Sequence, residues 1–230
     1  GSSRSRNLSA LRSYYNYLLK EEKVDNNPFL LVSGSKKEKK LPNFLQYNEL
    51  EKILEQCGDD PLGIRNRLII EMLIASGLRV SELVNIELED VDISSKSIKV
   101  MGKGKKERIV YFGEYALKSL DDYLPNSRDI LLRGKKSNKL FINHLGDDLT
   151  PRGVADIINR IIKLTSIERN VSPHTFRHSF ATMMLNEGAN TKVVQELLGH
   201  ESMATTSIYT HVSNDRLRHE YLKAHPRAKK

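Results

Sequence analysis

The sequence predicts a mainly α-helical fold that carries a small antiparallel β-sheet, an α+β arrangement. Apolar residues recur at intervals of three and four along most of the chain, as they do on one face of a helix. Residues 93–111 instead show strand-like alternation around two glycines. With 230 residues, the chain is long enough to bury a substantial core in one or two domains.

The first predicted helix covers residues 8–19. Its apolar and aromatic positions follow helical spacing: Leu8, Leu11, Tyr15, Leu18 and Leu19. Pro28 and Phe29 then interrupt the pattern, because proline lacks the amide hydrogen that a helix needs.

A polar, basic run at residues 33–43 is typical of a linker. It contains the letters SGSKKEKK and shows no apolar period. We therefore expect a short first region at residues 1–32, this linker, and a larger domain at residues 44–230.

The larger domain begins with helix signals at residues 46–56 and again after Pro61, since proline is favoured at the first helical position. The run RLIIEMLIASG is apolar enough for a buried helix that Gly77 ends. Arg79 and Glu82 follow, three residues apart, in a predicted short helix. Considered alone, an arginine at this place is a surface or ion-pair residue.

Residues 93–111 predict a β-hairpin or a longer meander. Ile98 and Val100 alternate with polar residues, and Gly102 and Gly104 permit a tight turn in the loop GKGKKER. The spacing of a nucleotide-binding P-loop is absent and a strand follows, so we do not expect ATP binding.

The later elements are mostly helical. They are helices at 114–123 and 150–164, a short strand at 140–142, a helix that Gly188 ends, a helix at 193–199, and a final helix at 215–225.

Composition narrows the class of protein. Lys plus Arg number 37 against 29 Asp plus Glu, and this net charge of +8 favours a polyanionic partner, although an ordinary basic protein has a similar excess. The single cysteine, Cys57, excludes an internal disulfide and a cysteine-rich zinc site. No apolar run reaches the roughly 18 residues of a membrane span and no signal peptide is evident, so we expect a cytoplasmic protein.

Reactive side chains are densest between residues 172 and 212. His174 and Arg177, three apart, would share one helix face. His200 ends the letters LLGH, and Tyr209 stands nine residues later. A phenol, two imidazoles and a guanidinium suit attack on a phosphodiester, because the phenolate is a nucleophile and arginine binds phosphate oxygens bidentately.

H-x-x-R, LLGH and TT-x-IYTH, in this order, resemble the active-site half of tyrosine recombinases, and specifically the bacterial Xer group. The resemblance extends from about Leu8 to Ala228. It implies a tyrosine recombinase catalytic domain at residues 44–230. For residues 1–32 it implies the last helix of an N-terminal core-DNA-binding domain, so the sequence resembles an N-terminally truncated form.

The resemblance also implies the catalytic residues. SGLRVSELVNI matches the first arginine motif of the family, and the hairpin lysine falls in GKGK. The implied catalytic set is Arg79, Lys103, His174, Arg177, His200 and Tyr209, with Glu82 as a supporting carboxylate that orients the site.

Each implied role follows the chemistry of a phosphotyrosyl transfer. Arg79 and Arg177 would bind the phosphate, Tyr209 would attack it, and Lys103 would protonate the leaving 5′ oxygen. His174 is the candidate base, and the imidazole of His200 would hydrogen-bond the phosphate.

Other basic residues are predicted to contact the DNA backbone, with plain solvation as the alternative. They are Lys36, Lys37, Lys39, Lys40, Lys105, Lys106 and Arg108. Such contacts would add affinity that falls with salt and carries no sequence information.

The pair His174 and His178 prompts a metal check. The glutamate of an H-E-x-x-H motif is absent, because Thr175 occupies that place, and no third ligand is evident. We expect no metal and no cofactor, and a structural role for His178.

The predicted function is site-specific DNA recombination through a 3′-phosphotyrosyl intermediate, in chromosome dimer resolution. Alternatives are a phage or transposon integrase with the same chemistry and a non-catalytic DNA-binding protein. Expected partners are double-stranded DNA, a homo- or hetero-tetramer with a second Xer recombinase, and a DNA translocase. Residues 214–230 would dock onto a neighbouring protomer or, alternatively, form a frayed basic tail.

Overall fold

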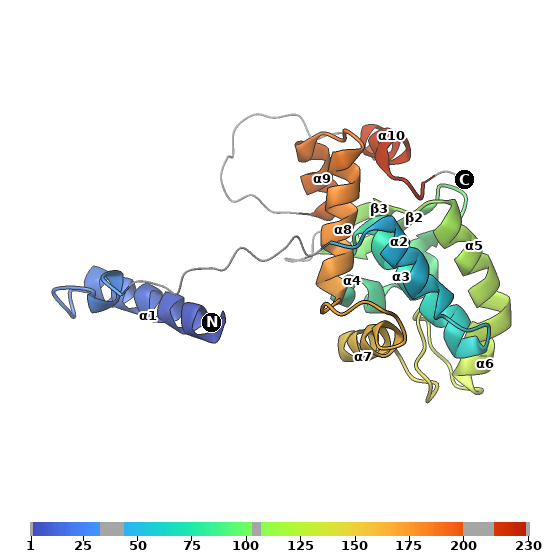
Figure 1. The fold of residues 1–230 in the computed structure, drawn as a ribbon, viewed down its shortest axis with the longest axis horizontal. Helices are drawn as coiled ribbons and strands as arrows, with labels where there is room; N and C mark the ends of the chain where they lie inside the picture. Colours follow the sequence, from blue (N-terminus) through green and yellow to red (C-terminus); the bar gives the residue numbers. More distant parts are fainter. Residues whose placement is uncertain (1, 33–43, 103–106, 200–213, 229–230) are drawn as a thin grey trace. The chain divides into compact units, whose positions relative to one another are not determined.

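The computed structural model describes residues 2–32, 44–102, 107–199 and 214–228 (Figure 1). The chain divides into two compact units, Gly1–Pro42 and Asn43–Lys230. Each unit has its own internal packing and is described by itself.

The first unit is a helix with a segment folded back along it. Helix α1 (Ser2–Lys20) contains the predicted helix at residues 8–19, and a 3₁₀ turn, η1 (Pro28–Leu30), follows. Arg12 donates from Nε to the carbonyl of Phe29 at 2.8 Å and from Nη2 to that of Val32 at 2.6 Å. These two bonds tie the returning segment to the helix.

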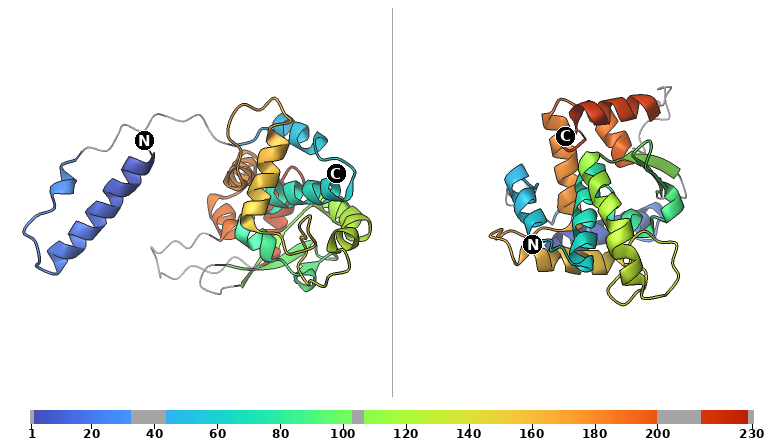
Figure 2. Two further views of the ribbon diagram at one scale, coloured as in Figure 1. Left: turned by 90° about the horizontal axis from the view of Figure 1, so that it is seen from below. Right: turned by 90° about the vertical axis from the view of Figure 1, so that its right-hand side faces the viewer.

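Helix α3 (Pro61–Ser76) runs through the middle of the second unit, with α5 (Glu114–Tyr123) and α8 (Pro173–Asn186) on either side (Figure 2). Asp60 caps its start by accepting a hydrogen bond from the amide of Gly63 at 2.9 Å. Gly77 ends it with a φ of 60°, a left-handed conformation that glycine adopts without a side-chain clash. Nearly the whole C-terminal half of α3 is buried, as its apolar sequence predicts.

The sheet has three antiparallel strands in the order β1 (Val91–Asp92), β2 (Ser97–Met101) and β3 (Glu107–Tyr111). Val100 pairs with Arg108 in the β2–β3 register. The structure confirms the predicted antiparallel sheet. Its inward face contributes Ile98, Val100 and Val110 to the core.

The predicted strand at residues 140–142 is wrong. These residues are fully buried, but only isolated bridges form nearby, Glu87 with Lys139 and Ile142 with Asp148. The segment satisfies its backbone groups differently, since the Tyr123 hydroxyl donates to the carbonyl of Leu140 at 2.9 Å. The apolar run at residues 140–142 therefore indicated a buried segment but not a strand.

The other elements complete the shell around α3. They are α2 (Tyr47–Glu55), α4 (Val80–Asn85), η2 (Leu88–Asp90), a π-turn η4 (Leu124–Arg128), α6 (Asp129–Leu132), α7 (Pro151–Ile162), α9 (Thr191–Leu198) and α10 (Asn214–Ala224). None of the helices in the described ranges combines the length and apolar character that a membrane span requires.

Helix α10 packs on its own chain and buries Leu217, Tyr221 and Ala224 in a second apolar cluster. The phenol of Tyr111, on β3, donates to the carbonyl of Asn214 at 2.9 Å. The alternative of a frayed tail is therefore wrong for residues 214–228, because three apolar side chains on one helix face suffice when α8 and α9 supply the other half of the cluster.

Candidate active site

Arg79 lies where α3 gives way to α4. Gly77 turns the chain sharply, and Arg79 becomes the residue that caps α4. Its amide and its Nη1 both donate to the carboxylate of Glu82, at 2.7 and 2.8 Å. Nη2 donates to the carbonyl of Gly199 at 2.9 Å. The side chain remains 35 % exposed, so a ligand can reach it.

Arg177 projects from α8 into the same region and is buried. Its two terminal nitrogens donate to the carbonyls of Gly77 and Leu198. Burial and the nearby charges of Arg79 and Arg108 together lower the pKa of Arg177 to about 10, against the opposing effect of the Glu82 carboxylate. The guanidinium is thus held by neutral acceptors beside other cations.

Glu82 is the carboxylate at the centre of this group. It is buried, and it accepts from Arg79 and from Nη2 of Arg108, the latter at 3.0 Å. We call the four residues Arg79, Glu82, Arg108 and Arg177 the arginine cluster. Among the described residues, three guanidiniums thus gather around one carboxylate, and an anion would balance the excess charge.

Arg108 differs from one of the two roles that its sequence suggested, DNA contact and plain solvation. Its side chain is only 15 % exposed, because it turns inward from β3 onto Glu82. Plain solvation is therefore wrong for this residue. Whether it contacts DNA stays a prediction.

His174 stands exposed in the first turn of α8, three residues before the buried Arg177. The predicted helix that carries both residues is confirmed. Among the described residues, no hydrogen bond or ion pair joins the imidazole to the arginine cluster, and its role as a base stays a prediction.

Several predicted residues lie outside the described residues: Lys36, Lys37, Lys39, Lys40, Lys103, Lys105, Lys106, His200 and Tyr209. The residue that precedes His200 lies within the described part of the chain. Gly199 ends α9 with a φ of 62° and its carbonyl accepts from Arg79. The residue just before His200 is thereby tied to the arginine cluster.

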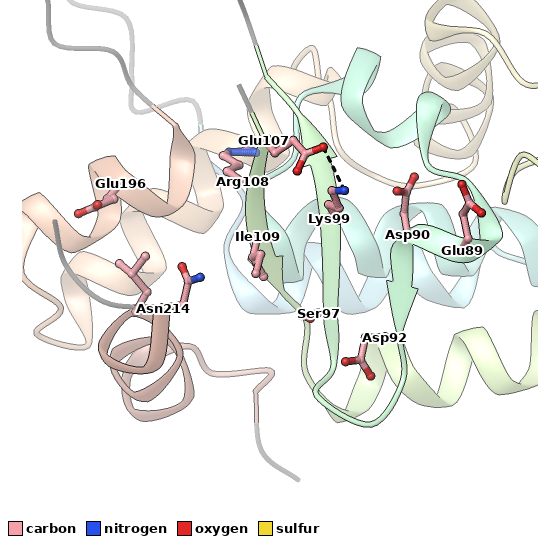
Figure 3. A pocket seen from close by; sticks show the side chains of 11 residues that line it. Glu89, Asp90, Asp92, Ser97, Lys99, Glu107, Arg108, Ile109, Glu196 and Asn214 are labelled. Atoms are coloured by element: carbon pink, nitrogen blue, oxygen red, sulfur yellow. Dashed lines mark ion pairs between the residues drawn. The ribbon is translucent and has the colours of Figure 1, made fainter. Parts of the chain in front are cut away.

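A hollow of about 820 Å³ lies beside Arg108, between the sheet and α10 (Figure 3). Lys99 and Glu107 form an ion pair there at 3.0 Å. Carboxylates dominate its rim: Glu89, Asp90, Asp92, Glu107 and Glu196. Because these charges repel phosphate, the phosphate-binding candidate is the arginine cluster and not this hollow.

His178 lies exposed on α8 with its ring edge-on to that of Phe44, at 6.4 Å between centroids. Within the described ranges, no three His, Cys, Asp or Glu side chains are grouped as a metal ion would require. Cys57 is buried, and burial raises the pKa of its thiol to about 11, which leaves it a poor nucleophile.

Sequence reasoning missed a second charged cluster, formed where the end of the chain meets α3. Arg227 donates from Nε to Glu71 at 2.8 Å and from Nη1 to Glu51 at 3.2 Å, and its guanidinium lies 4.0 Å from the ring centroid of Tyr115. We call Arg227, Glu71, Glu51 and Tyr115 the C-terminal cluster. A glutamate inside the apolar run RLIIEMLIA was the available signal.

Residues 43–216 match the phage integrase family. Tyrosine recombinase XerC of Halalkalibacterium halodurans is 48 % identical over 229 residues, which cover 97 % of this chain and 76 % of that protein. Tyrosine recombinase XerC of Listeria monocytogenes (strain HCC23) is 45 % identical over 227 residues, 97 % of this chain and 76 % of that protein.

A similar solved structure, described as the crystal structure of XerA recombinase, covers 96 % of this chain and 84 % of its own, with a TM-score of 0.63 and 29 % identity. XerH site-specific recombinase bound to difH substrate, a pre-cleavage complex, is 31 % identical with a TM-score of 0.61. That match covers 71 % of this chain and 48 % of XerH.

Proposed function

This chain belongs to the phage integrase family of tyrosine recombinases, and we propose that Tyr209 is the residue through which it cuts and rejoins DNA. The enzyme class is that of a tyrosine-type, site-specific strand-exchange recombinase, and DNA is its partner. The observation that supports the residue assignment is the arginine cluster, in which three guanidiniums outnumber the single carboxylate of Glu82.

In the proposed cleavage step, the phenolate oxygen of Tyr209 bonds to the scissile phosphorus as the bond from phosphorus to the 5′ oxygen breaks. His174 takes the phenol proton, and Lys103 gives a proton to the leaving 5′ oxygen. The products are a 3′-phosphotyrosyl link and a free 5′ hydroxyl. Help from a base is needed because the phenol's ordinary pKa is near 10.

Arg79 and Arg177 stabilise the non-bridging oxygens while negative charge builds on them, and His200 hydrogen-bonds the phosphate. Glu82 keeps Arg79 in position through the two hydrogen bonds described above. The arginines supply the positive charge that metal ions supply in many other phosphoryl-transfer sites. Since the phosphotyrosyl link conserves the energy of the phosphodiester, a 5′ hydroxyl of another strand reseals it without ATP.

The biological role we propose is chromosome dimer resolution in the cytoplasm, on a tetramer that includes a second Xer recombinase and responds to a DNA translocase. The identity of 48 % with a XerC protein over nearly the whole chain supports this role over that of a mobile-element integrase. Recombination between two chromosomal core sites in cells that lack their own XerC would test it. Failure of the protein to restore recombination there would contradict the role.

For the domains, we propose that residues 1–32 end a core-DNA-binding domain, that 33–43 follow the DNA backbone, and that 44–230 form the catalytic domain. Lys36, Lys37, Lys39 and Lys40 would then each contribute salt-sensitive affinity. Replacing all four by glutamine should flatten the salt dependence of DNA binding without changing sequence preference. An unchanged slope would contradict the placement of this segment.

A nicked suicide substrate tests the chemistry. The nick lets the short cleaved fragment diffuse away, which traps the covalent intermediate for a denaturing gel. We expect a slow-migrating adduct from the unaltered chain and from Tyr14→Phe, an exposed control tyrosine, and none from Tyr209→Phe. An adduct that persists in Tyr209→Phe would contradict the proposal.

A further inference from the structure

Arg108 occupies an unusual place for a charged residue. Side chains on a strand alternate between two faces, so Arg108 shares its face with the buried Val110 while Glu107 and Ile109 point outward. Its strand partner on that face is Val100, which is also buried. A guanidinium in a row of core residues is costly unless specific contacts compensate it.

The contacts of Arg108 converge on the two groups that hold Arg79. Its Nη2 donates to the same Glu82 oxygen, Oε2, that accepts the amide of Arg79. Its chain also lies against Gly199, where an added Cβ would stand 2.7 Å from Nε of Arg108. The carbonyl of that same glycine accepts Nη2 of Arg79. Arg108 therefore contacts both groups that hold the Arg79 guanidinium, the carboxylate of Glu82 and the backbone of Gly199.

The pKa of Arg108 is shifted in the same direction as that of Arg177. Burial lowers the pKa of Arg108, the carboxylate of Glu82 opposes this, and the charge of Arg79 adds to it. Its Nε and Nη1 are buried and have no hydrogen-bond partner among the residues that the structure describes. Within the described part of the chain, these two donors are therefore an uncompensated cost of burying the side chain.

We propose that Arg108 is a positioning residue for strand cleavage, which fixes the Arg79 guanidinium through Glu82 and Gly199 and adds positive potential at the scissile phosphate. The inference rests on the function proposed above. It predicts that Arg108 acts on the chemical step and not on DNA affinity.

The first test is single-turnover cleavage of the suicide substrate at saturating DNA. Arg108→Ala should slow adduct formation by about tenfold or more and leave the dissociation constant for DNA within about twofold. The control is Lys99→Ala, on the neighbouring strand, whose exposed ion pair with Glu107 lies outside the arginine cluster and whose loss should leave the rate unchanged. Equal rates for Arg108→Ala and the unaltered chain would overturn the inference.

A second substrate separates positioning from a general loss of structure. A methylphosphonate at the scissile position lacks one charged non-bridging oxygen, so the arginines have less charge to stabilise there. The defects of Arg79→Ala and Arg108→Ala should both shrink on it, each to about threefold or less. If the Arg108→Ala defect is the same on both substrates, the residue is merely structural and the inference is overturned.

Arg108→Gln serves the same comparison if the alanine variant does not fold, because it keeps part of the side-chain volume and an N–H donor while it removes the charge. Different results would reject the proposed function and the inference about Arg108. No adduct from the unaltered chain would reject the proposed function and this inference together. An adduct from the unaltered chain, with an equal one from the folded Arg108 variants, would reject the inference alone.

Discussion

Arg177 and Arg227 are both buried in the second unit, but their surroundings are opposite. Arg227 meets the carboxylates of Glu71 and Glu51 and the face of an aromatic ring. Arg177 meets two backbone carbonyls, and its charged neighbours are two further arginines and Glu82. A buried charge that is fully compensated serves the fold, whereas an undercompensated one marks a place where an anion binds.

The pKa directions show the same contrast. Burial lowers the pKa of Arg227, but the combined effect of Glu71, Tyr47 and Glu51 outweighs this and the pKa is raised. Burial lowers the pKa of Arg177, and Arg79 reinforces the effect. The charges of the C-terminal cluster are therefore balanced within the fold, whereas we propose that a bound phosphate balances those of the arginine cluster.

The largest effect on stability is expected from breaking the compensated cluster. Arg227→Ala leaves the carboxylate of Glu71 buried without its main partner, so the free energy of unfolding should fall by about 3–5 kcal/mol. Urea unfolding measures this. Arg218→Ala, an exposed arginine on α10, is the control and should change the free energy by less than about 0.5 kcal/mol. Equal losses of unfolding free energy in Arg227→Ala and Arg218→Ala would contradict a stabilising role for the C-terminal cluster.

The pH dependence of stability sharpens the comparison at His225. Its Nε2 lies 3.1 Å from the carbonyl of Ile74, and its Nδ1 accepts from the amide of Arg227, so the buried ring is neutral with its proton on Nε2. Burial lowers the pKa of His225 to about 4. The unfolded chain, with a pKa near 6.5, therefore binds more protons between these values, and stability falls as pH drops through this window.

From pH 7 to pH 5, the contribution of His225 should lower the free energy of unfolding by about 2 kcal/mol. Denaturant unfolding over a pH series measures the slope. His225→Gln should flatten that slope, and His219→Gln, exposed on the same stretch of chain, should retain it. A slope that survives in His225→Gln would assign the acid sensitivity elsewhere.

The smallest expected effect concerns two buried phenols. The hydroxyl of Tyr221 is buried and has no partner in the described ranges, so Tyr221→Phe should leave stability unchanged or raise it by up to about 1 kcal/mol. Tyr123 donates to the carbonyl of Leu140, so Tyr123→Phe should cost about 1 kcal/mol. Thermal or urea unfolding of both variants checks the pair, and a larger loss in Tyr221→Phe would reveal a partner for that hydroxyl.

Sequence reasoning succeeded where the signal was local. Helical spacing, Pro61 and Gly77 predicted α3, and the motif around Arg79 predicted a short helix with Glu82 close by. It failed where the outcome depended on distant partners. Residues 140–142 are buried without forming a strand.

The two clusters illustrate the same limit. Glu71 and Arg227 lie 156 residues apart in the sequence, and no local sequence pattern predicts their pairing. The inward direction of Arg108 was available from its alternation with Val110 on β3, but its contact with Glu82 required the fold. The motifs implied that Arg79, Arg177 and Glu82 share one site, but they did not predict that Arg108 joins them.

Single-turnover cleavage by Arg177→Ala, measured together with its urea unfolding, most directly tests whether the arginine cluster is built for a phosphate. We expect cleavage to slow by about a hundredfold or more, corresponding to roughly 3–4 kcal/mol in the barrier, while stability stays near that of the unaltered chain. A loss of less than about tenfold, or a loss of stability like that of Arg227→Ala, would contradict that role.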